Sequence, residues 1–169
     1  MARLNSAGRQ LLIEQYEKGP AELESALSHA PESMRKWRPE PSEFSVHEII
    51  VHCADSETNS HGRIRYVLAE ENAQIVGYDP GHWATRFNYA DHPLEPALET
   101  VKAVRANTVP ILRRLTEGDW AKAGTHSEHG AGYSAELWLK IYAEHCREHA
   151  AQIDATVAAW RAAGEPSSA

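Results

Sequence analysis

The sequence has few cysteines and lacks the long apolar segments of a membrane helix or an export signal. Only two of its 169 residues are cysteines, Cys53 and Cys146, and they form no CxxC pair. That is too few for a disulfide framework or a cysteine-built zinc module. No stretch approaches the run of about 20 apolar residues that a membrane helix needs. The N-terminal sequence MARLNSAGRQ lacks the apolar segment of an export signal. We therefore expect a cytoplasmic protein with no membrane partner.

Basic residues are also scarce and are not clustered. Seventeen lysines and arginines stand against 24 acidic residues, which gives a net charge of −7. Because binding to a phosphate backbone depends on clustered cations, we expect no nucleic-acid partner. The remaining composition, 42% hydrophobic and 24% charged, is globular, and the chain is long enough for one domain with its own core.

Four helical segments can be recognised, and no strand pattern competes with them. The segment 46–71 has the clearest start, because Ser45 and Glu48 form a capping box and Phe44 and Ile49 stand at the positions of the hydrophobic staple. The other three segments are about 6–29, 95–116 and 135–162, the last capped by Ser134.

Prolines and connections set the predicted course of these helices. Gly19-Pro20 should kink or split the first helix, and Pro110 should bend the third. The connection 72–93 is far longer than is usual in a bundle, so we expect a crossover with short helical turns that lets helices two and three run parallel. The predicted fold class is all-α: a four-helix bundle forming one domain over residues 1–169, with a polar loop at 117–133 and a frayed tail at 164–169.

Histidine is the residue type present in excess, with ten in the chain. His145 and His149 are one helical turn apart, and their Cβ atoms are expected about 5–6 Å apart on one face, which suits two ligands of one metal. Ile141 and Ile153 share that face, so both imidazoles should point into the core. An unpaired polar group there costs on the order of 1–3 kcal/mol. A metal would satisfy both rings, but so would hydrogen bonds to backbone or tyrosine hydroxyls.

His52 favours the metal. It lies in the second turn of the helix that begins at residue 46, beside the apolar run 49–51. Histidines on the inward faces of two helices can converge in a bundle core. Three imidazoles leave coordination positions open for water or substrate, which is the layout of a catalytic zinc site rather than a structural one. We predict that His52, His145 and His149 bind one divalent transition metal, with zinc as first choice and nickel as second.

The order of several motifs resembles the DinB-like superfamily of metal-dependent enzymes. The motifs are WRP at 37–39, FSVHEIIVHCADSE at 44–57, LTEGDW at 115–120, HSEHG at 126–130 and YAEHCREHAAQI at 142–153. Within this superfamily the chain is most similar to the branch that includes the bacillithiol S-transferases, from about residue 8 to 160. The resemblance implies a four-helix bundle with a metal at His52, His145 and His149.

Three positions depart from the pattern of that branch. The branch often has an aromatic residue where Glu144 stands, a further histidine where Gln152 stands and a histidine where Glu57 stands. The three proposed ligands are unaffected, but the thiol-transfer substrate does not follow from them. The resemblance implies a small-molecule substrate such as a low-molecular-weight thiol.

Two acidic residues near the proposed ligands need separate interpretations. Asp55 follows His52 by three positions, so it could orient a ligand imidazole or act as a base; the alternatives are a solvated carboxylate or a pair with Arg63. We predict Asp55 as the catalytic residue. Glu148 completes a formal HxxEH motif with His145 and His149, but that mechanism needs a further downstream carboxylate ligand. We expect Glu148 to face solvent.

The remaining candidates have less specific interpretations. Cys53 and Cys146 each directly follow a proposed ligand, a displacement of about 100° around the helix, and we expect them to be buried space-fillers. His126 and His129 precede the last helix and could line the mouth of the site. The expected function is a metal-dependent enzyme that activates a thiol or water for transfer to a small molecule. A metal-dependent hydrolase and a non-catalytic metal-binding stress-response protein are the alternatives, and a homodimer is left open.

Overall fold

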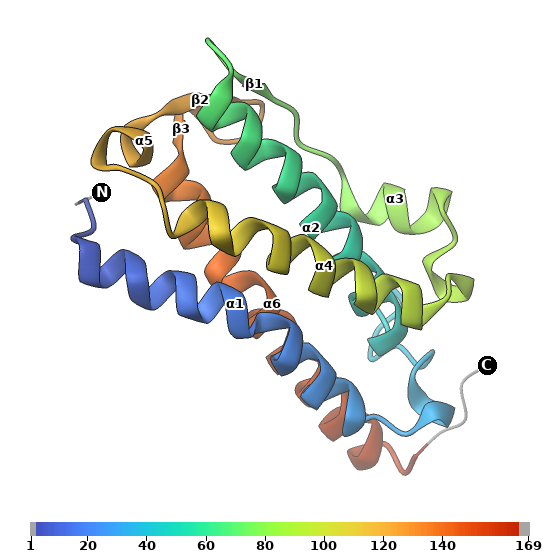
Figure 1. The fold of residues 1–169 in the computed structure, drawn as a ribbon. Helices are drawn as coiled ribbons and strands as arrows, with labels where there is room; N and C mark the ends of the chain where they lie inside the picture. Colours follow the sequence, from blue (N-terminus) through green and yellow to red (C-terminus); the bar gives the residue numbers. More distant parts are fainter. Residues whose placement is uncertain (1–2, 166–169) are drawn as a thin grey trace.

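The computed structural model describes residues 3–165, and it is built mainly of helices (Figure 1). The four long helices are α1 (Ser6–Ser28), α2 (Val46–Ala69), α4 (Leu94–Leu112) and α6 (Ala135–Ala162). The short elements are η1 (Glu32–Met34), β1 (Gln74–Ile75), α3 (Pro80–Arg86), η2 (Tyr89–Asp91), α5 (Glu117–Ala121), β2 (Ala123–His126) and β3 (Gly130–Ser134). The predicted all-α class and four-helix bundle are confirmed. None of the described helices is long and apolar enough to cross a membrane.

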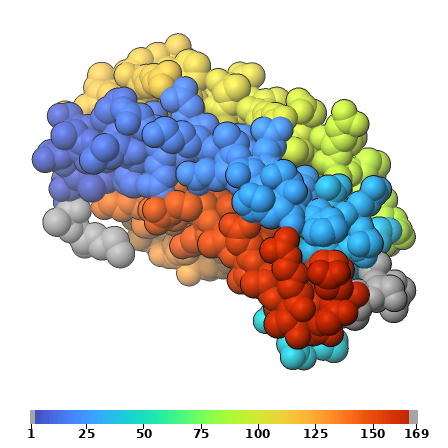
Figure 2. All heavy atoms as spheres, turned by 90° about the horizontal axis from the view of Figure 1, so that it is seen from below, coloured from blue at the N-terminus to red at the C-terminus, as the bar shows by residue number. Residues whose placement is uncertain are grey.

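The long helices pair in two layers. Helix α1 lies against α6, and α2 lies against α4; Figure 2 shows α1 and α6 side by side along one face. Helices α2 and α4 run in the same direction, because the connection between them returns along the bundle through β1, α3 and η2 (Figure 1). The predicted crossover, with its short helical turns, is confirmed.

Side-chain caps decide where the helices begin and end. The predicted capping box of α2 is present: the Glu48 N–H donates to Ser45 Oγ over 3.3 Å, and the Ser45 N–H donates to the Glu48 carboxylate over 3.0 Å. Helix α4 ends at Leu112, four residues before the predicted end at Thr116. Thr116 instead forms a second capping box with Asp119 and starts α5. A strong N-cap therefore interrupts an apolar pattern that would otherwise extend the helix.

Helix α1 continues through Gly19-Pro20, so the predicted split does not occur. Pro20 has no N–H to donate, and the carbonyl of Tyr16 one turn earlier therefore loses its helical partner. Arg105 Nη1 of α4 donates to that carbonyl over 2.6 Å. Gly19 provides the space, since a Cβ there would lie 2.3 Å from the same nitrogen. The Gly-Pro pair is thus the point at which Arg105 contacts α1.

A small three-stranded sheet closes one end of the bundle, where a polar loop was predicted. Strand β1 pairs with β2 in parallel, and β2 pairs with β3 antiparallel with an irregularity at Gly124/Thr125. The strands are short, and Gly124 lies at a buried position of β2. Only glycine fits there, because a Cβ would lie 2.5 Å from the Ala73 carbonyl oxygen. Without an apolar side chain at that position, the alternation that marks a strand is absent from the sequence.

Buried apolar residues form two clusters with a polar layer between them. On α2, Ala54 belongs to one cluster and Ile64 to the other; on α4, Val101 and Val109 are divided in the same way. The buried side chains between these residues are polar: Ser56, Glu57, Ser60, Arg105 and Thr108. At the end of α6, the N–H groups of Gly164 and Glu165 bond back to the helix. The rest of the predicted frayed tail lies outside the described residues.

Candidate metal centre

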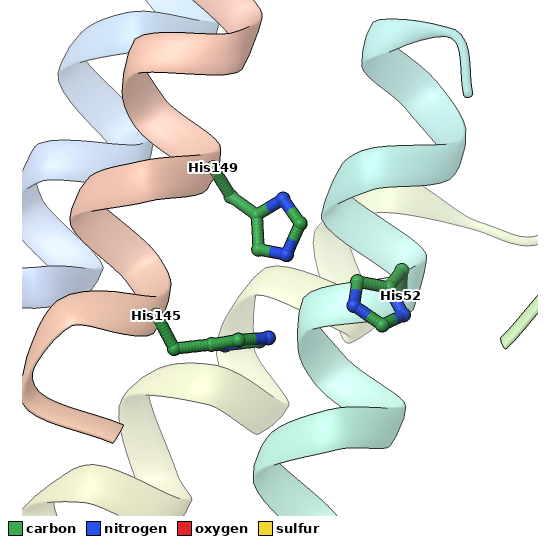
Figure 3. A group of neighbouring side chains, drawn as sticks. All are labelled: His52, His145 and His149. Carbon is green, nitrogen blue, oxygen red and sulfur yellow. The ribbon is translucent and has the colours of Figure 1, made fainter. Parts of the chain in front are cut away.

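The three histidines predicted as ligands meet in the middle of the bundle. His52 projects from α2, while His145 and His149 project from successive turns of α6 toward it (Figure 3). The ring centroids are 5.5 Å apart for His52 and His145, 4.9 Å for His52 and His149, and 4.6 Å for His145 and His149. One ring nitrogen of each histidine lies within 4.8 Å of the others. The i, i+4 spacing on α6 therefore brings two donors to the same place as a third from α2.

The environment keeps two of these imidazoles, those of His52 and His149, neutral. Burial, together with the neighbouring histidines, lowers the pKa of His52 from 6.5 to about 3. Burial and His145 likewise lower the pKa of His149 to about 4. Both side chains therefore carry no proton charge at pH 7, and each keeps a nitrogen lone pair. Neutral imidazole is the form that binds a metal.

The second nitrogen of each α6 histidine faces a side-chain oxygen. Gln152 Oε1 lies 2.9 Å from His149 Nδ1, a contact in which that nitrogen donates and Nε2 stays free for a metal. His145 Nδ1 lies 3.6 Å from Glu57 Oε1. Among residues 3–165, the buried Nδ1 atoms of His52 and His145 have no hydrogen-bond partner. Three imidazoles this close together, with an unpaired buried Nδ1 atom on each of His52 and His145, fit a divalent transition metal.

A buried ion pair lies behind His145. Glu57 and Arg105 are fully buried, and Arg105 Nη2 donates to Glu57 Oε1 over 2.5 Å. Burial raises the pKa of the Glu57 carboxyl. The charge of Arg105 and the contact with His145 lower the pKa by more than burial raises it, so the net pKa lies below its usual value. Glu57 is therefore an anion inside the bundle. In the sequence, Glu57 and Gln152 are visible only as departures from a family pattern, which does not predict their positions beside His145 and His149.

Asp55 is not part of the histidine cluster. Its carboxylate accepts a hydrogen bond from the Tyr89 hydroxyl of η2. The alternative partner, Arg63, donates instead to the Tyr142 hydroxyl and to the Val76 carbonyl, each over 2.9 Å. Asp55 is half-buried on the helix that carries His52, and its predicted role in proton transfer remains a prediction.

The remaining candidates lie outside the histidine cluster. Glu148 is exposed, as predicted, and Cys53 and Cys146 are buried free thiols. Burial raises the pKa of both thiols, so in the metal-free protein they stay protonated at pH 7. His126 is buried on β2 and its Nε2 has no partner within residues 3–165, while His129 is exposed beside it.

The fold and the site define a helical bundle with a candidate three-histidine metal centre. A model of the DinB superfamily matches residues 15–153, and the chain belongs to that superfamily. An Oceanobacillus iheyensis protein named "Putative metal-dependent hydrolase" is 33% identical over 110 residues, which cover 65% of this chain and only 63% of that protein. "Putative metal-dependent hydrolase YfiT" from Bacillus subtilis is 25% identical over 141 residues, covering 83% of this chain and 79% of YfiT.

The solved structure of YfiT resembles this fold over most of both chains. The TM-score is 0.86 at 22% identity, with 98% of this chain and 93% of YfiT covered. That protein is described as "a probable metal-dependent hydrolase with an unusual four-helix bundle topology". At this level of identity the likeness establishes the fold, whereas any function must be argued from the site.

Proposed function

We propose that this protein is a metal-dependent enzyme whose centre, formed by His52, His145 and His149, activates water or a thiol for attack on a small molecule. The observation that carries the proposal is the convergence of three imidazoles, whose nitrogens lie within 4.8 Å of one another. His52 is buried and the two α6 histidines are half-buried, and His52 and His149 have pKa values far below 6.5. A divalent transition metal held there would lower the pKa of a bound water or thiol and so supply a nucleophile near pH 7. Zinc is the proposed metal, with nickel as the second choice.

The surrounding residues supply orientation and proton transfer. Gln152 fixes the ring of His149 through its 2.9 Å contact with Nδ1. Asp55 is the proposed proton acceptor, and the Tyr89 hydroxyl that donates to it holds its carboxylate in place. His145 remains 16% exposed at its side chain, so a small molecule can approach the centre from that side.

Arg63 extends the polar surroundings of the centre toward His126 on β2, whose pKa is lowered by burial and by the charge of Arg63. Arg63 bonds to Tyr142, whose ring lies 5.9 Å from that of His145. The Nε of Arg63 and the Nε2 of His126 are buried without a hydrogen-bond acceptor in the described part of the chain. Unpaired buried donors favour a substrate with an anionic or carbonyl oxygen rather than an apolar one.

Product formation with two nucleophiles separates the two versions of this function. The assay incubates the metal-loaded protein with a halogenated nitrobenzene and several cellular thiols, and in parallel with small esters and amides in water. Because a free thiol has a pKa near 8.5 and is mostly protonated at pH 7, metal-dependent conjugation that saturates with thiol would support the transferase. Metal-dependent cleavage of an ester or amide would support the hydrolase, which agrees with the names of the relatives.

One variant and one negative result complete the test. Asp55→Asn should keep its metal and slow the reaction, because it removes a proton acceptor without removing a ligand. If the fully loaded protein shows neither reaction, the enzymatic proposal is wrong and a non-catalytic metal-binding role replaces it.

A further inference from the structure

The ion pair behind the metal centre has a role that the proposed ligands do not explain. We propose that Glu57 is a positioning residue, which accepts the Nδ1 proton of His145 and thereby keeps Nε2 of that ring free for the metal, while Arg105 holds Glu57 in place. The inference rests on the proposed function, since it assumes that the three histidines bind a metal. A histidine ligand usually donates its second N–H to a carboxylate or a carbonyl, which fixes the ring and its tautomer.

The contacts of Glu57 assign its two oxygens to donors. Arg105 Nη2 donates to Oε1 over 2.5 Å, and His145 Nδ1 lies 3.6 Å from the same oxygen. The hydroxyls of Tyr16 and Ser60 each lie 3.4 Å from Oε2. Glu57 also lies with His145 and Cys146 in a group whose donor atoms are within 4.8 Å of one another, but its Oε1 is already held by the Arg105 guanidinium. We therefore assign Glu57 the role of proton acceptor.

Arg105 is held by three helices. Besides Glu57 on α2, its guanidinium donates to the Tyr16 carbonyl of α1 over 2.6 Å and to the Tyr142 carbonyl of α6 over 2.9 Å. The Tyr16 carbonyl is available because Pro20 cannot donate to it. The guanidinium therefore cannot follow a movement of Glu57 without losing backbone contacts, and it fixes the carboxylate against the helix that carries His145.

Stability alone does not explain the buried ion pair of Glu57 and Arg105. An ion pair buried in a bundle core contributes little net stability, because the desolvation of both charges offsets their attraction. An apolar pair of similar volume would fill the same space. A function in ligand orientation accounts for a carboxylate at this depth, 3.6 Å from a ligand imidazole.

The decisive variant is Glu57→Gln. The amide keeps one oxygen, which can stay at the position that Arg105 and His145 share, but it removes the negative charge. Because a hydrogen bond to a neutral oxygen is about half as strong as one to a carboxylate, the Nδ1–H form of His145 is held less firmly. Loss of such an outer-shell partner typically weakens metal binding by about 10–100-fold.

The matched control is Glu136→Gln on α6, which removes another buried carboxylate. Glu136 is 7% exposed and paired with Arg9 over 3.1 Å, more than two turns away from His145. Isothermal titration of the metal-free proteins with Co²⁺ or Zn²⁺ should show weakened binding in Glu57→Gln and unchanged binding in Glu136→Gln. Both variants should lower the melting temperature, so stability alone does not distinguish them. Equal affinity of wild type and Glu57→Gln would overturn the proposal.

A second measurement does not depend on the variant folding or on metal binding. Long-range ¹H–¹⁵N correlation spectra of the metal-free protein, with histidines labelled and His145 assigned by substitution, report which ring nitrogen carries the proton. We expect the Nδ1–H form of His145. The Nε2–H form would refute the role of Glu57 even if the metal binds. A wild-type protein that binds no metal would instead refute the metal centre and leave the tautomer result to decide on Glu57.

Discussion

Replacing Gly19 by alanine tests the contact on which the position of Arg105 depends. An alanine Cβ would lie 2.3 Å from Arg105 Nη1 and 2.8 Å from Cys146 Cβ. The guanidinium cannot easily move, because Tyr16, Glu57 and Tyr142 each accept a hydrogen bond from it. Overpacking of this kind costs about 1–3 kcal/mol. In a chain of this size each kcal/mol lowers the melting temperature by about 2–4 °C.

A second glycine supplies the control. Gly62 also lies inside a long helix, but a Cβ there would meet only Tyr66 Cε2, at 3.9 Å. Gly62→Ala should therefore stabilise the protein by up to about 1 kcal/mol through helix propensity, while Gly19→Ala should destabilise it. Urea unfolding of the metal-free proteins, followed by circular dichroism, measures both. If Gly19→Ala is as stable as Gly62→Ala, the proposed docking of Arg105 on α1 is wrong.

Two further predictions concern metal and pH. A chelator should lower the melting temperature, because a ligand of the folded state alone stabilises it by mass action, yet the apolar clusters should keep the bundle folded; complete unfolding would mark a structural site instead. In the folded, metal-free protein the pKa is about 3 for His52 and about 4 for His149, against 6.5 as the reference. Between about pH 4 and 6.5 the unfolded chain therefore binds more protons than the folded chain, so the free energy of unfolding should fall as the pH drops through this range. Urea unfolding across the range should show a smaller fall in His52→Gln than in wild type, and a stability that rises on acidification would contradict the prediction.

The sequence predicted those features that depend on local patterns. The capping box at Ser45 located the start of α2 to the residue, and the i, i+4 spacing of His145 and His149 placed both on one helical face. Each of these signals depends on residues within one or two turns. The convergence with His52 required only that both faces point inward, which the apolar neighbours indicated.

Features that depend on contacts between distant segments were not predictable in this way. Gly19-Pro20 was expected to kink or split α1, and the split was wrong because the partner that replaces the lost hydrogen bond, Arg105, is 85 or more residues away. Arg105 carried a signal nonetheless: it lies four residues after Val101 on the inward stripe of α4, where a charged residue needs a buried partner. Glu57 likewise lies four residues after the buried Cys53 on α2, so its carboxylate also needs a buried partner. The small sheet was missed because its strands contain glycines where an alternating apolar pattern would have been visible.

Metal content in matched variants tests the central claim most directly. Elemental analysis of the purified wild-type chain should find about one divalent transition metal per chain, as expected for a mononuclear site. His145→Ala and His149→Ala should lose it, whereas His129→Ala, which changes a separate cluster formed by His126, Glu128 and His129, should retain it. Full metal content in either α6 variant, or its loss in His129→Ala alone, would contradict the three-histidine centre.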